Sequence, residues 1–476
     1  MASDKTSNFE LFKFKELSDA LWAVLYSFVD SSSADGFSSV SIDSRNISGG
    51  GLFTALSGDN FDGHSFVSEA FKKGAAAAVV ENKKLETYNL IQTAKDFNKT
   101  LIVTDNSLKA LQNAARLYLE KFPRLIKVGI TGSSGKTTIK EIISNIVSKE
   151  KKVVMNPGNY NSETGLPLSV FNVRPWHEAG IFEMAMNHRG EMAALASILK
   201  PDIALISNVT STHIGNIGSL EGIAKEKKQI FLYFNEKCTA MIPQESPFRD
   251  FLAEGVKGKI VFYGRESFTE LGEVIDLGLK GTEIVWDGQK VLFTLPGGYN
   301  FSNALAAISV AKEIPVSNNA IRCGLESVKP LFGRSEISNG KMTVIWDCYN
   351  ANPQSMERAL EFCENLDWHG RRIYIIGEML ELGKFSEKAH SDIGKILASS
   401  KADLIFLFGE ETKATSETIN ASLYEGGTAP QVFHTCNMDE LSLMLGNKVT
   451  EGDLLLVKGS RACNLEKLSS ILKGAA

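Results

Sequence analysis

The residues with the clearest chemistry form a glycine-rich turn between an expected strand and an expected helix. The segment is Gly129-Ile130-Thr131-Gly132-Ser133-Ser134-Gly135-Lys136-Thr137-Thr138, and apolar residues then follow at helical spacing from Ile139 to Val147. Such a turn points backbone N–H groups at phosphate oxygens, while the lysine adds charge and the next hydroxyl a Mg²⁺ ligand. We predict a phosphate-binding loop, although a standard one has glycine where this chain has Ile130. A turn that only connects strand to helix would leave Gly-Lys-Thr-Thr unexplained.

Two further polar residues follow expected strands of the same region. Glu183 lies in the apolar run 181–185, and His213 comes just after the run 203–208. Because open α/β sheets bind ligands at the carboxyl ends of their strands, a carboxylate and an imidazole there are candidate metal ligands. Taken alone, each also fits a plainer interpretation, a surface carboxylate and a hydrogen-bonded loop histidine. The lysine-rich segment 223–231 fits a helix with a solvated basic face.

Composition limits the function classes. The chain has 476 residues with 43% hydrophobic and 22% charged residues and a formal net charge of −5, which fits a soluble globular protein. That charge offers no general basic surface for nucleic acid or an anionic membrane. We expect no signal peptide and no membrane insertion, because no sufficiently long apolar stretch occurs. The six widely spaced cysteines favour a reduced, cytoplasmic location.

The patterns of expected strands, helices and glycines divide the chain into three zones. Residues 1–104 contain short β-type runs separated by glycines, and a polar stretch near residue 105 opens a helix-like segment. Strand and helix patterns alternate through residues 105–315 and again through 316–476, as a mainly parallel sheet requires. We therefore predict an α/β protein with a small first domain, a central domain that carries the phosphate loop, and a doubly wound C-terminal domain.

Nine stretches together match one family. They are Ile42-Asp43-Ser44-Arg45, Asp62-Gly63-His64, residues 131–138, Gly158-Asn159-Tyr160-Asn161, residues 208–213, residues 300–307, Tyr349-Asn350-Ala351-Asn352-Pro353, Glu378-Met379-Leu380-Glu381-Leu382-Gly383 and residues 457–461. On these stretches, which span almost the whole chain, the protein resembles the Mur ligases of peptidoglycan synthesis. The stretch 349–353, followed by 378–383, is typical of the members that add D-Ala-D-Ala.

The resemblance implies an architecture, an activity and its ligands. It implies a UDP-sugar-binding domain (1–104), a central ATP-binding P-loop domain with a mainly parallel sheet (105–315) and a Rossmann-like C-terminal ligase domain (316–476). It implies an ATP-dependent amide ligase that passes through an acyl phosphate, with ATP, two Mg²⁺ ions and a carbamylated lysine at Lys227. The implied partners are UDP-N-acetylmuramoyl-tripeptide and D-Ala-D-Ala, and we expect a cytoplasmic monomer.

The resemblance also assigns residues. The implied ATP-binding residues are Gly132, Ser133, Ser134, Gly135, Lys136, Thr137, Thr138, Asn300, Asn303, Arg334 and Asp347. The implied substrate-binding residues are Ser44, Arg45, Asn159, Asn161, Asn350 and Asn352. The implied metal ligands are Thr137, Glu183, His213 and Lys227 as its carbamate, and the implied catalytic residues are Lys136, Lys227, His213 and Glu183.

The chain departs from the family pattern at several of these positions, and two other functions stay open. Tyr299 replaces a usual histidine, Ser162 a common asparagine, Glu378 a common aspartate, and Trp346-Asp347-Cys348 a frequent Asp-Asp-Ser. A sister ligase or a folylpolyglutamate synthetase would share the ATP machinery and add another amino compound. A P-loop ATPase switch would hydrolyse ATP without any amino acceptor. The acceptor peptide's third residue, lysine or diaminopimelate, also stays open.

Overall fold

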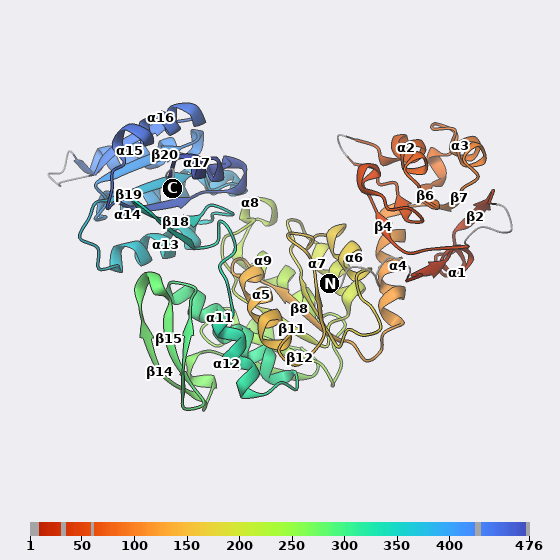
Figure 1. Cartoon of the computed structure of the whole chain (residues 1–476), viewed down its shortest axis with the longest axis horizontal. Coiled ribbons are helices and arrows are strands. Elements are labelled where there is room, and N and C mark those ends of the chain that lie inside the picture. Colours follow the sequence, from red (N-terminus) through yellow and green to blue (C-terminus); the bar gives the residue numbers. More distant parts are fainter. Residues whose placement is uncertain (1–8, 30–34, 59–60, 424–429, 473–476) are drawn as a thin grey trace. The chain divides into compact units, whose positions relative to one another are not determined.

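The computed structural model describes residues 9–29, 35–58, 61–423 and 430–472 (Figure 1). Two compact units divide the chain: residues 1–127 with 154–184 and 193–200, and residues 128–153 with 185–192 and 201–476. Helices alternate with mainly parallel sheets in the described residues, which confirms the predicted α/β class. None of the described helices has both the length and the apolar character needed to cross a bilayer. All six cysteines are unpaired thiols.

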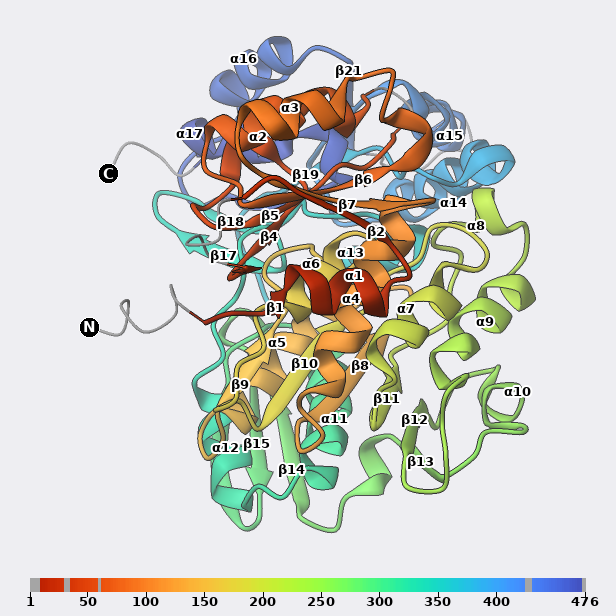
Figure 2. The ribbon, with the colours of Figure 1, turned by 90° about the vertical axis from the view of Figure 1, so that its right-hand side faces the viewer.

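The N-terminal part of the first unit is built on a five-stranded sheet in the order β2-β7-β6-β5-β4. Strands β4 to β7 run parallel and β2 runs antiparallel to β7. Helices α2 and α3 cover one face, where Phe53, Val80 and Leu101 pack in a buried core (Figure 2). The elements are β1 Phe12–Lys13, α1 Phe14–Ala20, β2 Val24–Ser27, β3 Gly36–Phe37, β4 Val40–Ser41, β5 Leu52–Thr54, α2 Val67–Lys72, β6 Ala77–Glu81, α3 Leu90–Asp96, β7 Thr100–Thr104 and α4 Ser107–Glu120.

The predicted phosphate loop follows the fourth strand of a six-stranded sheet with the order β13-β12-β11-β8-β10-β9. Strands β8, β11, β12 and β13 pair in parallel, so their carboxyl ends share one edge. The strands are β8 Ile126–Thr131, β9 Val153–Met155, β10 Ala179–Glu183, β11 Ile203–Ile206, β12 Thr239–Pro243 and β13 Lys259–Tyr263. The helices are α5 Lys136–Val147, α6 Gly165–Val170, α7 Glu191–Leu199, α8 Ile214–Ile217, α9 Leu220–Lys228, α10 Arg249–Ala253, α11 Gly298–Glu313 and α12 Asn318–Glu326.

Two features of this region differ from the sequence expectation. The lysine-rich segment 223–231, expected as a helix, is α-helical only as far as Lys228 and continues as a 3₁₀ turn, Gln229–Phe231. An antiparallel sheet of β14 (Leu271–Asp276), β15 (Thr282–Trp286) and β16 (Gln289–Phe293) stands in a segment for which no strands were predicted. Burial alternates strictly along β15, which buries one face of this small sheet.

The C-terminal region contains a second six-stranded sheet in the order β17-β18-β22-β19-β20-β21. All neighbours pair in parallel except β17, which is antiparallel to β18. One face packs against α16 and α17 through a core that includes Trp346, Phe406 and Leu441. The elements are β17 Glu336–Asn339, β18 Thr343–Asp347, α13 Pro353–Asn365, β19 Arg372–Gly377, α14 Ser386–Ala398, β20 Leu404–Phe408, α15 Lys413–Leu423, β21 Gln431–Thr435, α16 Met438–Lys448, β22 Leu454–Lys458 and α17 Ser469–Leu472.

Candidate active site

The glycine-rich loop connects β8 to α5 and needs its glycines for space as well as for backbone freedom. Gly132 and Gly135 have φ of 148° and 80°. A Cβ on Gly132 would lie 1.8 Å from the Ser207 Oγ, and one on Gly135 would lie 2.4 Å from the Asn303 Oδ1. The structure therefore brings Asn303, an expected nucleotide residue, directly against the loop. Side chains at either glycine would collide with the residues that surround it.

Asn208, just after β11, braces this loop with both ends of its amide. Its Oδ1 accepts hydrogen bonds from the backbone N–H groups of Ser133 (3.1 Å) and Ser134 (2.9 Å). Its Nδ2 donates to the carbonyl oxygen (3.2 Å) and the hydroxyl (3.0 Å) of Ser134. Ser207 adds a 2.6 Å bond from its hydroxyl to the Ser134 carbonyl. Sequence reasoning placed Asn208 in a matching stretch and missed this role.

Two lysines meet beside the loop. The Lys136 Nζ donates to the Gly132 carbonyl at 2.8 Å, so the ammonium lies folded over the loop. Lys227 in α9 is 1% exposed, and its burial, together with the nearby Lys136 charge, holds the pKa of its amine well below the ordinary value. A neutral amine is the form that reacts with CO₂. Burial of Lys227 therefore favours the neutral form that a carbamate requires.

His213 lies at the start of α8 and contacts a residue of the 378–383 stretch. Its backbone is left-handed, with φ of 62°, and its Nδ1 lies 2.5 Å from the Glu381 Oε2. The two groups are close enough for an ion pair but are not aligned as a hydrogen bond. This contact holds the pKa of Glu381 below its ordinary value, and burial opposes it.

Glu183 is positioned by asparagines of the loop that follows β9. The Asn156 side chain is fully buried and makes two hydrogen bonds to the Glu183 backbone, at 2.9 and 3.0 Å. The Asn161 Nδ2 donates to the Glu183 Oε1 at 2.7 Å. The structure thus joins two of the predicted site residues, whereas Asn159 is exposed in the same loop. Asn156 lies outside the matching stretch 158–161, yet it fixes the backbone of Glu183.

Within the described residues, no group of three or more His, Cys, Asp or Glu side chains is arranged as a metal cage. Mg²⁺ seldom uses such a cage, because it keeps waters and binds through one or two protein oxygens and the phosphates of its substrate. The Thr137 hydroxyl, the first side-chain oxygen after Lys136, is buried at the start of α5. The donors present therefore fit a magnesium ion that is shared with a nucleotide.

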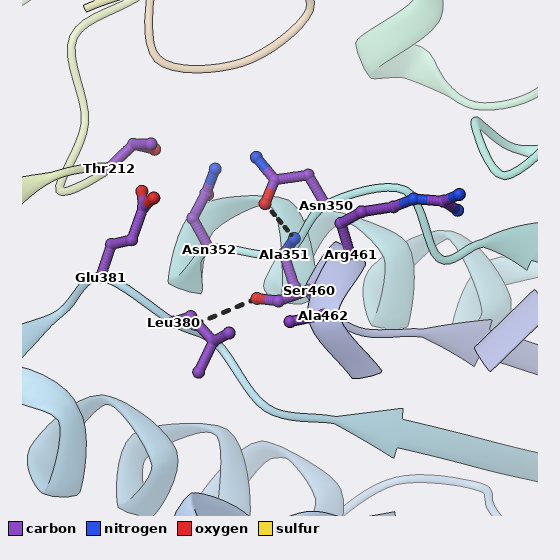
Figure 3. A pocket seen from close by; sticks show the side chains of 9 residues that line it. All are labelled: Thr212, Asn350, Ala351, Asn352, Leu380, Glu381, Ser460, Arg461 and Ala462. Carbon is purple, nitrogen blue, oxygen red and sulfur yellow. Dashed lines mark hydrogen bonds between the residues drawn. The ribbon is translucent and has the colours of Figure 1, made fainter. Parts of the chain in front are cut away.

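The loop after β18 lines a cavity of about 210 Å³ (Figure 3). Its other walls come from the 380–381 and 460–462 loops and from Thr212. Asn350 accepts a hydrogen bond from the Ala351 N–H (2.9 Å), and Asn352 caps α13 by accepting from the Ser355 N–H (2.9 Å). Amide, carboxylate, hydroxyl and guanidinium groups thus surround one small cavity. It suits a ligand with several polar groups.

The remaining predicted residues lie in two places. The Arg334 guanidinium stacks 4.0 Å from the centroid of the Tyr349 ring, and Asn300 is buried at the start of α11. In the first unit, Arg45 donates to the Asp43 carboxylate through its Nε and Nη2 and holds the pKa of that carboxyl at about 2. The Ser44 hydroxyl donates to Glu69 at 3.1 Å. Arg45 itself is mostly exposed and therefore accessible to a ligand.

Three family models match consecutive parts of the chain. Residues 37–119 match the Mur ligase family catalytic domain, residues 130–311 the Mur ligase middle domain, and residues 333–461 the Mur ligase glutamate ligase domain. The UDP-N-acetylmuramoyl-tripeptide–D-alanyl-D-alanine ligase of Treponema pallidum is 40% identical over 93% of this chain and 95% of its own. The chain belongs to the Mur ligase family.

Other relatives agree with this Mur ligase assignment. The Bacillus subtilis ligase of the same name is 30% identical over 90% of this chain and 92% of its own. The solved MurF of Acinetobacter baumannii superposes with a TM-score of 0.83, at 26% identity, over 97% of this chain and 98% of that one. The Thermotoga maritima MurF ligase in complex with ADP gives a TM-score of 0.77, at 27% identity, over 91% and 97%.

Residues that depart from the Mur ligase pattern still make polar contacts. The Tyr299 hydroxyl, in place of the usual histidine, hydrogen-bonds to the Ser335 hydroxyl at 2.7 Å. The Glu378 carboxylate, in place of a common aspartate, accepts from the Glu411 N–H at 3.0 Å. Ser162 accepts from the Gly165 N–H at the start of α6. These substitutions therefore have local structural partners.

Proposed function

We propose that this chain is the ATP-dependent ligase that joins D-Ala-D-Ala to UDP-N-acetylmuramoyl-tripeptide. The 40% identity to the Treponema pallidum ligase, which extends over 93% of this chain, carries the assignment. The glycine-rich loop with Lys136 supplies the ATP chemistry, and the MurF complex with ADP supports nucleotide use. The product is UDP-N-acetylmuramoyl-pentapeptide, a precursor of the cell wall.

The reaction takes two steps. A carboxylate oxygen of the tripeptide attacks the γ-phosphorus of ATP, and the bond to the bridging oxygen of ADP breaks. The dipeptide amine then attacks the acyl carbon, phosphate leaves with the electrons of the C–O bond, and the amine loses a proton. Two anions meet in the first step, so Lys136 lowers their repulsion and stabilises charge on the phosphoryl oxygens.

Mg²⁺ would supply further neutralisation of phosphate charge when it is bound. Thr137, Glu183 and His213 are the side chains that we assign to the two ions. A carbamate on Lys227 would give this position an oxygen ligand in place of an ammonium that repels metal. The burial of Lys227 and its lowered amine pKa support that modification.

The other ligands are assigned to three parts of the chain. We place the UDP-sugar at Ser44 and Arg45 in a domain of residues 1–104, with Asn159 and Asn161 serving the tripeptide. Residues 105–315 form the ATP domain, in which Asn300 and Asn303 bind the nucleotide. Arg334 and Asp347, from the segment 316–476, bind the same nucleotide. Residues 316–476 receive D-Ala-D-Ala at Asn350 and Asn352, whose cavity has the polar lining that a dipeptide needs. The matches of three family models to separate segments support this division.

Phosphate release by the purified protein tests the proposal. We expect release only when UDP-muramoyl-tripeptide and D-Ala-D-Ala are both present, and none with single amino acids or glutamate as the amine. Acceptors that end in lysine and in diaminopimelate should be compared. Preference for another amine would identify a sister ligase, and ATP hydrolysis without any amine would identify an ATPase switch. Sedimentation tests the expected monomer, and fractionation of cells its expected cytoplasmic location.

A further inference from the structure

Lys458 is a buried lysine that none of the roles above uses. It is the last residue of β22, and its side chain is 1% exposed. Its Nζ lies 2.5 Å from the Asp347 Oδ2 and donates to the Asn350 carbonyl oxygen at 3.3 Å. Asp347 is the last residue of β18, the strand next to β22, and Asn350 lies in the loop that follows it. One ammonium therefore holds the end of β18 and the loop beyond it.

The sheet register fixes this arrangement. β18 and β22 pair in parallel, with Asp347 opposite Lys458 at the last pair of the ladder. A buried ammonium is costly unless a countercharge and hydrogen bonds accompany it, and Asp347 and the Asn350 carbonyl provide them. The backbone of both strands thus leaves Lys458 little freedom to seek other partners. The Lys458 ammonium therefore interacts with the Asp347 carboxylate and the Asn350 carbonyl oxygen.

The two partners of Lys458 have different expected ligands. Asp347 is assigned to the nucleotide, and Asn350 lines the cavity assigned to the dipeptide (Figure 3). Tyr349 lies between them, with its N–H bonded to the Gly333 carbonyl at 3.0 Å and its ring against Arg334. The segment from Asp347 to Asn350 therefore links the two assigned sites. Lys458 is the side chain that anchors both of its ends.

We propose that Lys458 is a positioning residue that sets the nucleotide-side carboxylate and the acceptor-side loop together. The proposal rests on the ligands assigned to Asp347 and Asn350 in the proposed function. Lys458 itself touches neither substrate. Its loss should therefore weaken the binding of ATP and of D-Ala-D-Ala at the same time, although the two substrates share no contact with it.

Steady-state kinetics of Lys458→Met and Lys458→Arg test this, with Arg371→Met as the control. Arg371 pairs with buried Asp453 at 2.7 Å, just before β22, so the control breaks an ion pair at the opposite end of the same strand. We expect Lys458→Met to raise KM for ATP and for D-Ala-D-Ala by about tenfold each, as the loss of one charged hydrogen bond implies. In Lys458→Arg, both KM values should return part of the way toward those of the wild-type protein. Arg371→Met should lower Tm and leave both KM values unchanged.

Unchanged KM values in folded Lys458→Met, with only Tm or kcat per total protein reduced, would show a purely structural lysine. A rise in one KM alone would overturn the joint role. If neither Lys458 variant folds, Asp347→Asn provides the test, because it must raise the dipeptide KM as well as that for ATP. Failure of the proposed function is distinguishable, since the wild-type protein would then release phosphate without the dipeptide.

Discussion

At the residue scale, Gly132 has the sharpest structural requirement in the phosphate loop. We expect Gly132→Ala to reduce ATP turnover by roughly a hundredfold, because a Cβ 1.8 Å from the Ser207 Oγ must displace the loop that holds the phosphates. Phosphate release measures the loss. Gly446→Ala is the control, since a Cβ there meets nothing within 4 Å. Near-normal turnover of Gly132→Ala would show that the loop is not used in catalysis.

The buried amine of Lys227 gives a second prediction at this scale. Lys227→Ala should lower turnover by about a hundredfold or more, because the oxygen ligand of the proposed carbamate is lost, and a small carboxylic acid such as acetate should restore part of it. Lys225→Ala is the matched control, as this lysine is exposed on the same helix. An equal loss without rescue, while metal binding stays normal, would contradict a carbamate.

Asn352 combines a structural role with an assigned substrate role, and substitutions can separate them. Asn352→Ala should cost about 1 kcal/mol of unfolding free energy, because the N-cap of α13 is lost, and should raise KM for D-Ala-D-Ala. Asn352→Ser keeps a capping oxygen, so stability should return while KM stays high. Urea unfolding and kinetics measure the two effects. If Asn352→Ser restored both, the residue would be a cap only.

At the scale of elements, the sequence located the parallel strands well because each is a short apolar run that is buried on both faces. β8 precedes the phosphate loop as expected, and β10 and β11 overlap the apolar runs 181–185 and 203–208. The β14–β16 sheet was missed because its strands are less buried than the parallel ones: β14 has no fully buried residue, and β15 and β16 bury only some of theirs. The hairpin signal was nevertheless present, since the favoured turn pair Asp287-Gly288 stands between the apolar runs 284–286 and 291–293.

That hairpin provides the prediction at this scale. Asp287 and Gly288 both have positive φ, 51° and 74°, as the two central residues of a tight hairpin turn require. Gly288→Ala should therefore lower the free energy of unfolding by about 1 kcal/mol, measured by urea denaturation. In the helix α16, Gly446→Ala should instead raise it, because alanine is the better helix former. An unchanged free energy of unfolding in Gly288→Ala would show that the turn can accept a side chain without strain.

In the candidate site, residues that are consecutive in the sequence could be predicted, whereas residues that meet only in the fold could not. The phosphate loop could be recognised because its glycines, lysine and threonine are consecutive. Asn208 bonds to a loop about 75 residues earlier, and Lys458 to a carboxylate 111 residues earlier. Nothing in the spacing of such residues marks them, because the sheet register alone brings them together. Glu183 and His213 could be proposed from their places near strand ends, whereas Lys227 came only from the family resemblance.

For the whole molecule, three separate parts of the chain are assigned to one reaction, and its acyl phosphate would hydrolyse in water. The protein must therefore exclude solvent before the amine attacks, which requires the parts to close around their ligands. We expect the radius of gyration from small-angle scattering to fall when an ATP analogue and the UDP-tripeptide are added together, and to change less with either alone. We expect the joint effect because each ligand is assigned to a different part of the chain. An unchanged radius would mean that water is excluded by local loop movements instead.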